Sequence, residues 1–109
     1  MGRDYQFHRE HAGCSVTAVV HLGTVRELEL LVNGKPVGFE RLHGHHAGAR
    51  TLTTVLPTDP PVGIDVRLEL PGAMRGDPVC VLADGDRQWP MPLRPVPRTA
   101  RPTEASWYS

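Results

Sequence analysis

The dipeptide Asn33-Gly34 lies between two segments in which apolar and polar residues alternate. It favours a two-residue type I′ turn, because both central residues of that turn need positive φ, which Asn and Gly tolerate best. The turn predicts an antiparallel hairpin over residues 26–42 with three facing pairs: Val32 with Lys35, Leu30 with Val37, and Leu28 with Phe39. Both arms then place their apolar residues on one face and their Glu residues on the other. A slip of one residue would turn an apolar set toward water, so turn chemistry and hydrophobic pattern agree on this register.

Alternation with a period of two recurs along the chain and is plainest from Ile64 to Leu70, which Pro71-Gly72 ends. Further strands are predicted at residues 5–7, 14–22, 51–56, 79–83 and 87–93. The last two form a second hairpin on Asp84-Gly85, with Cys80 facing Trp89 and Leu82 facing Arg87. Helix is limited to a turn or two near residues 73–75. About eight short strands at this spacing predict an all-β fold, an antiparallel β-sandwich of seven to eight strands.

The length and the charge of the chain argue against several classes of function. A chain of 109 residues is one domain of ordinary size, large enough to bury a core without metal or disulfide cross-links. Twelve basic residues balance twelve acidic ones and are spread along the chain, which argues against nucleic acid or an anionic membrane as a partner. The polar N-terminus does not resemble a signal peptide, and no apolar run is long enough for a membrane span. We therefore expect a cytoplasmic protein or a component of an assembly such as a virion.

The two cysteines, Cys14 and Cys80, both fall on predicted strands and face the predicted core. Their separation resembles that of the bridge between the two sheets of immunoglobulin domains, which implies an immunoglobulin-like architecture. The chain departs from that family at two points: the strand after Cys14 has no Trp, and Pro78 stands where the family has a Tyr. We expect the architecture without membership of the family. Without an export signal, two buried thiols are favoured over a disulfide.

Five histidines suggest an alternative function. His43, His45 and His46 lie in a Gly-rich loop, and His8 and His11 lie upstream. Imidazole is a good ligand for zinc, and a loop can fold several histidines around one ion. None of the established metal-binding spacings is present, however, so exposed loop histidines are the simpler interpretation. No nucleophile and base can be assembled from the sequence either, and we predict no catalytic residues.

The C-terminal residues differ from the rest of the chain. Pro residues recur from Pro90 to Pro102, and each removes a donor from a strand ladder, so this segment cannot be a central strand. We predict a β-sandwich domain over residues 1–93 and a Pro-rich arm over 94–109. The arm ends in aromatic residues, which often anchor interfaces. The candidate interaction residues are Pro95, Pro97, Arg98, Trp107 and Tyr108.

These features predict a non-catalytic protein that acts through protein contacts, as an accessory subunit or a structural component of a larger assembly. The arm would dock on a protein partner or on another copy of the chain, and no cofactor is required. The alternative is a protein that uses the histidine loop to bind a divalent metal such as zinc, or a small ligand. This alternative includes a catalytic protein.

Overall fold

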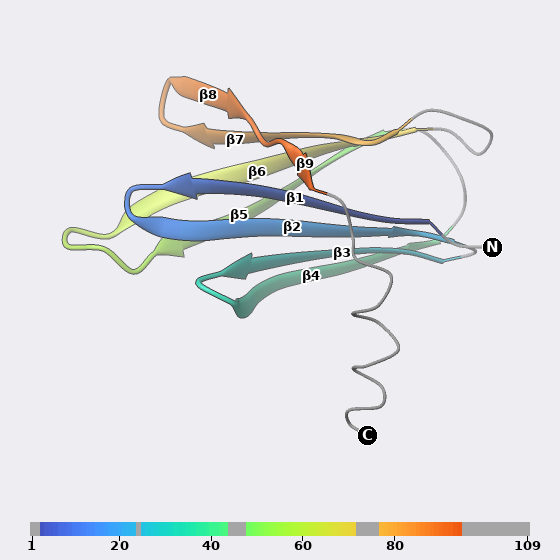
Figure 1. The fold of residues 1–109 in the computed structure, drawn as a ribbon, viewed down its shortest axis with the longest axis horizontal. Helices are drawn as coiled ribbons and strands as arrows, with labels where there is room; N and C mark the ends of the chain where they lie inside the picture. The colour runs from blue at the N-terminus through green and yellow to red at the C-terminus, as the bar shows by residue number, and fades with distance from the viewer. Residues whose placement is uncertain (1–2, 24, 44–47, 72–76, 95–109) are drawn as a thin grey trace.

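The computed structural model describes residues 3–23, 25–43, 48–71 and 77–94, which form nine strands and no helix. The strands are β1 (Arg3–His11), β2 (Cys14–Leu22), β3 (Val25–Val32), β4 (Lys35–His43), β5 (Gly48–Leu56), β6 (Val62–Leu70), β7 (Val79–Asp84), β8 (Arg87–Pro90) and β9 (Leu93–Arg94). The predicted all-β, antiparallel fold is confirmed at this level (Figure 1). The helical turn predicted near residues 73–75 lies outside the described residues.

The strands form two antiparallel sheets, with the orders β4-β3-β2-β1-β9 and β5-β6-β7-β8. The chain leaves the first sheet after β4 and returns to it after β8. On the return, the backbone N–H of Met91 donates to the carbonyl oxygen of Cys80 (2.9 Å), and the N–H of His8 donates to that of Pro92 (3.1 Å). The short strands β8 and β9 are both at sheet edges, where Pro is tolerated. Arg94 pairs with Gln6, so strand pairing extends one residue past the predicted domain boundary.

One hydrophobic cluster contains the buried side chains of both sheets. Its members alternate with more exposed residues along β2, β3 and β6, as expected for strands with one buried face. The largest fully buried side chains include Leu28, Leu30, Leu56, Ile64, Leu68 and Leu82. Cys14 and Cys80 are both buried and both free, which agrees with the expectation of two thiols.

The β3–β4 hairpin follows the predicted register only next to its turn. Asn33 and Gly34 have φ values of 53° and 82°, and Val32 faces Lys35 as predicted. A bulge at Val37 then shifts the pairing by one residue, so Phe39 faces Glu29 instead of Leu28. The prediction that Val37 and Phe39 join the core is wrong: they are 44% and 58% exposed. The insertion of one residue moves the rest of β4 to the opposite face.

The β7–β8 hairpin turns one residue later than predicted. Asp84 is the last residue of β7 and faces Arg87, so the turn is Gly85-Asp86, and Leu82 faces Trp89. The predicted facing pairs, Cys80 with Trp89 and Leu82 with Arg87, are therefore wrong. Of the two turn residues, Gly85 alone has positive φ (63°), which is the φ pattern of a type II′ turn with Gly first. Asp84 remains in the strand, where its carboxylate contacts His11.

Candidate interaction surface

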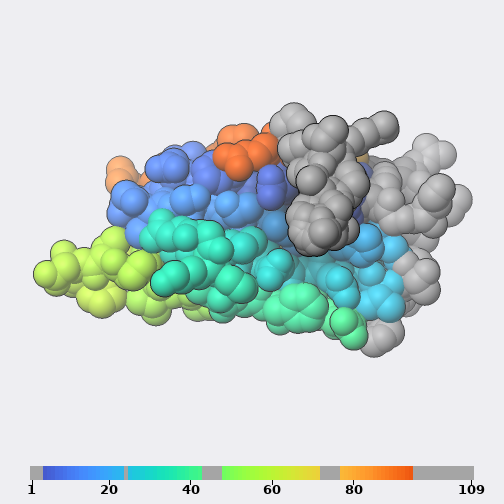
Figure 2. Space-filling model, turned by 60° about the horizontal axis from the view of Figure 1, so that its bottom comes forward, coloured from blue at the N-terminus to red at the C-terminus, as the bar shows by residue number. Residues whose placement is uncertain are grey.

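Edge strands β4 and β5 lie at the same side of the molecule, which we call the β4–β5 side. Each is the outermost strand of its sheet and nine residues long. Arg50 Nε on β5 lies 3.4 Å from Glu40 Oε2 on β4, so an ion pair joins the two sheets here. Figure 2 shows the teal surface of β4 next to the yellow-green surface where β5 ends and the chain turns toward β6.

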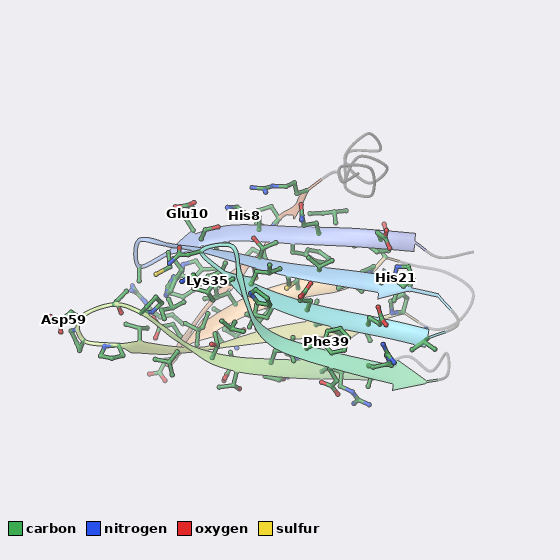
Figure 3. The ribbon with its side chains drawn as sticks, turned by 90° about the horizontal axis from the view of Figure 1, so that it is seen from below. His8, Glu10, His21, Lys35, Phe39 and Asp59 are labelled. Carbon is green, nitrogen blue, oxygen red and sulfur yellow. The ribbon has the colours of Figure 1, made fainter. Side chains whose placement is uncertain are left out.

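A hollow of about 260 Å³ opens on the β4–β5 side, beyond the Glu40–Arg50 ion pair. Its lining combines apolar side chains with the polar rim of the β3–β4 turn, and consists of Val32, Asn33, Lys35, Val37, Val55 and Pro57. Val55 is 59% exposed, and Phe39 follows Val37 by two residues on the same strand. Figure 3 shows Phe39 on β4 and Lys35 at the turn. The hollow and these exposed side chains make the β4–β5 side a candidate binding surface.

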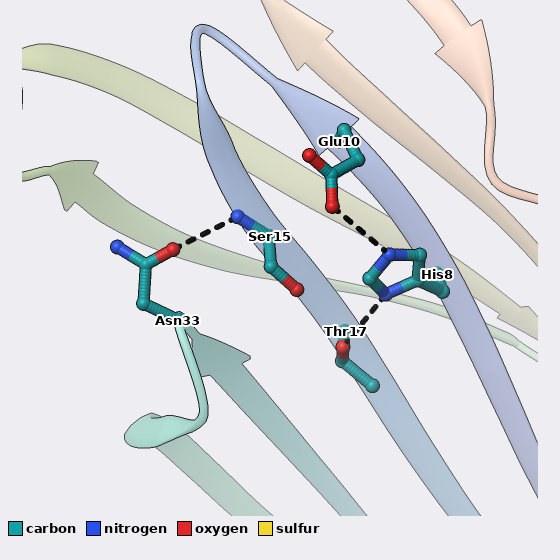
Figure 4. A network of polar contacts seen from close by, with 5 residues as sticks. All are labelled: His8, Glu10, Ser15, Thr17 and Asn33. Carbon is teal, nitrogen blue, oxygen red and sulfur yellow. Dashed lines mark hydrogen bonds and ion pairs between the residues drawn. The ribbon is translucent and has the colours of Figure 1, made fainter.

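Asn33 fixes the rim of the hollow. Its backbone N–H donates to the carbonyl oxygen of Ser15 (2.8 Å), and its side-chain Oδ1 accepts from the N–H of Ser15 (3.0 Å) (Figure 4). The residue that gives the turn its positive φ therefore also ties the turn to the start of β2. The sequence identified the first role but gave no signal for the second.

The β4 edge carries several features that oppose pairing with a further strand. Lys35 and Pro36 begin the strand, and the bulge at Val37 interrupts its ladder. Glu40 faces the buried Leu28 in the register, so it points toward the second sheet, where it meets Arg50. Charged residues, Pro, bulges and inward-pointing charges are the means by which edge strands avoid pairing with other chains. The β4 edge is therefore suited to contacts through side chains, not to strand addition.

A second polar cluster joins the two sheets at the β1–β2 turn. His11 Nε2 lies 2.8 Å from Asp84 Oδ2, and the His11 ring lies 4.7 Å from that of Trp89. The Arg9 guanidinium lies over the same indole at 5.3 Å, and its Nε is buried with no hydrogen-bond partner among the described residues. Cys14 is the cross-strand partner of His11, but no hydrogen bond joins this thiol to the imidazole within the described structure. The cluster links β1 to β7 and β8 and offers no nucleophile paired with a base.

The histidines of the metal hypothesis do not meet in the described part of the chain. His8 contacts Thr17 (3.1 Å) and Glu10 (3.6 Å) (Figure 4), whereas His11 contacts the second sheet. Since successive residues of a strand alternate faces, His8 and His11 point to opposite sides of β1. The described residues contain no group of three or more His, Cys, Asp or Glu that could hold a metal ion.

The other predicted residues lie largely beyond the described structure. The backbone of His43 ends β4 opposite Val25, at the other end of the first sheet from His11. The side chain of His43, together with His45 and His46, lies outside the described residues, so metal binding by that loop stays a prediction. His21 is half-exposed and hydrogen-bonded to Asp4. The predicted interaction residues Pro95, Pro97, Arg98, Trp107 and Tyr108 also lie outside the described residues.

Sequence reasoning missed the β4–β5 side because it assigned Val37 and Phe39 to the core. A signal was present: Pro36 and Gly38 flank Val37, and Pro or Gly within a strand often marks a bulge. Gly38 faces Leu30, and a Cβ added to it would lie 3.6 Å from Leu30 Cβ, an ordinary contact. A side chain at position 38 would therefore contact Leu30 without a steric clash. The bulge is thus not forced by a clash at this position.

In the described part of the chain, no helix has the length and apolar character needed to cross a membrane. Comparisons of the chain with protein-family models, with curated proteins and with solved structures give no match.

Proposed function

We propose that this protein is a non-catalytic β-sandwich of immunoglobulin-like arrangement that acts through protein contacts made by its β4–β5 side. Its role would be that of an accessory subunit or a structural component of a larger assembly. The observation that carries the proposal is the apolar hollow with the exposed Val37 and Val55 in its lining.

Exposed apolar residues are informative when they adjoin one another. Single exposed hydrophobic side chains are normal on protein surfaces, whereas an apolar patch around a hollow marks a contact site. Complete burial of a Val side chain is worth about 1.5 to 3 kcal/mol, so a partner that covers the half-exposed Val37 and Val55 would gain a useful part of that for each. Val79 and Leu93 are also exposed but line no part of the hollow.

The described polar clusters support a non-catalytic role. His11, Asp84 and Trp89 connect the two sheets, and His8 is engaged by Thr17 and Glu10. These contacts explain the two histidines as structural residues.

The proposal is tested by comparing two substitutions of the same type, Val55→Glu and Val79→Glu. The two valines are 59% and 54% exposed, so neither change should unfold the protein. In an extract of its source cells, we expect the wild type and Val79→Glu to migrate on a sizing column as a complex larger than the monomer. Val55→Glu should migrate as a monomer. If all three proteins migrate as monomers, the β4–β5 side is not an interaction surface.

A further inference from the structure

The chain leaves the described fold at the edge opposite the hollow. β9 is the outermost strand of the first sheet on one side and β4 on the other. Because β9 pairs antiparallel with β1, Leu93 lies opposite Phe7 and Arg94 opposite Gln6. The backbone therefore runs toward Arg3 as it leaves, away from the end of the sheets where the Asn33-Gly34 turn borders the hollow (Figure 1).

The length of chain after Arg94 permits docking on the same molecule or on another. Residues 95–109 would span about 46 Å as polyproline II. Four strand spacings separate β9 from β4, a distance of roughly 19 Å. To reach its own hollow, the segment would have to reverse its direction and cross the whole first sheet. A neighbouring molecule can be reached without reversing the direction of β9, which points away from the hollow of its own chain.

The chemistry of residues 95–109 suits the hollow. Pro95, Pro97 and Pro102 have no N–H, so this segment is a poor partner for strand addition, which the β4 edge also opposes. Pro-rich segments bind instead by placing side chains in apolar grooves. The hollow, at about 260 Å³, is smaller than the roughly 300–1,000 Å³ of sites for drug-sized molecules, which favours one or two side chains as its occupant. Trp107 and Tyr108 are anchors of the kind that dominate binding energy at interfaces.

We infer that the partner of the β4–β5 side is a second copy of this chain, whose residues 95–109 dock in the hollow. The inference rests on the proposed function of the β4–β5 side and names its partner. Each copy would then offer a segment at one edge and a hollow at the other. Such a contact joins two different surfaces, so it produces open chains of molecules or closed rings, the smallest of which is a dimer with two reciprocal contacts.

Two full-length variants test this arrangement, one with an altered hollow and one with an altered segment. Val55→Glu changes the hollow, and the double change Trp107→Ala with Tyr108→Ala removes the proposed anchors. Loss of a hot-spot aromatic typically weakens association by roughly 30-fold or more. In analytical ultracentrifugation we expect the wild type to self-associate and each variant alone to be a monomer. An equimolar mixture should form a complex of twice the mass of one chain and nothing larger, because one intact segment and one intact hollow remain.

The controls and other outcomes separate the alternatives. Val79→Glu should assemble like the wild type, and equal melting temperatures would exclude unfolding as the cause of any loss. A wild type that is monomeric in purified form at all concentrations would overturn the inference. The proposed function would still stand if Val55→Glu dissociates a complex in the cell extract. A two-fold dimer of β4–β5 sides would also overturn the inference: the Trp107/Tyr108 variant would then still dimerise, and the mixture would contain no new complex.

Discussion

The chain passes from one sheet to the other between β4 and β5 and again between β8 and β9. These two sides of the molecule differ in how they are packed. At the β8–β9 side, the residues Met91 and Pro92 make the passage, and both form backbone hydrogen bonds to neighbouring strands. Met91 is 3% exposed, and its sulfur accepts from the buried Cys80 thiol (3.5 Å). At the β4–β5 side, an exposed ion pair joins the sheets, and the accessible side chains of Val37 and Val55 line a hollow.

The β4–β5 side, which we call the open side, is therefore not simply a less complete form of the β8–β9 side, which we call the closed side. The β4 edge has Lys35, Pro36 and a bulge, which protect it from pairing with other strands. Its apolar side chains were nevertheless left exposed. Protection of the backbone together with exposure of side chains is what a surface needs to bind a partner selectively without aggregating.

The largest difference between the sides should appear when Met91 is truncated. Met91→Ala removes a buried side chain from the closed side and should lower the free energy of unfolding by about 2 to 5 kcal/mol. Val37→Ala on the open side should cost less than about 1 kcal/mol, because Val37 is half-exposed. Urea denaturation measures both values. Equal losses would mean that the two sides are equally packed.

Asn33 provides the next test, because it shapes the open side. Asn33→Ala has two effects: Ala tolerates φ 53° less well than Asn, and the Ser15 N–H loses its acceptor. Together they should lower the free energy of unfolding by about 2 kcal/mol. Asn33→Gly keeps the backbone conformation and should cost about half as much. If Gly proves as destabilising as Ala in urea denaturation, the turn conformation is not what Asn33 contributes.

The closed side also predicts a pH dependence. Burial raises the pKa of the Cys80 thiol from 9.0 to about 12. Between these values the unfolded chain carries a thiolate and the folded chain a thiol, so ionisation favours unfolding. Stability should therefore fall as the pH rises from 9 toward 12, by up to about 1.4 kcal/mol per pH unit from this group. Cys80→Ala should reduce this slope and Cys14→Ala should retain it; equal slopes for both variants and the wild type would refute the assignment.

The smallest effect is expected from the ion pair of the open side. The side chains of Arg50 and Glu40 are 48% and 36% exposed, so water screens their interaction. Arg50→Ala should cost less than about 1 kcal/mol, and the difference should shrink at high salt. A loss as large as that of Met91→Ala would show that Glu40 and Arg50 hold the sheets together as firmly as the closed side does.

Much of the fold follows from local sequence patterns. The alternation of apolar and polar residues correctly predicted strands within β2, β3, β6 and β7, and Asn33-Gly34 correctly predicted the first turn. These features depend on neighbours along the chain, so sequence reasoning can reach them. The error at Phe39 arose because a single bulge reverses every later side chain in the strand.

The sites were harder to predict because they depend on distant residues. His11 and Asp84 are 73 positions apart, and nothing local indicates their contact. The hollow likewise combines residues of β3, β4 and β5, of which Val37 looked like a core residue. From the sequence we predicted contacts with other chains through residues 94–109; apart from Arg94, these residues lie outside the described structure, so this stays a prediction.

Hydroxyl-radical footprinting of the assembled and the dissociated protein tests the role of the β4–β5 side most directly. It measures side-chain accessibility without any substitution. We predict that Val37 and Val55 become protected on assembly, whereas Val79 and Leu93 react equally in both states. Equal reactivity of Val37 and Val55 in the assembled and dissociated protein would contradict the account.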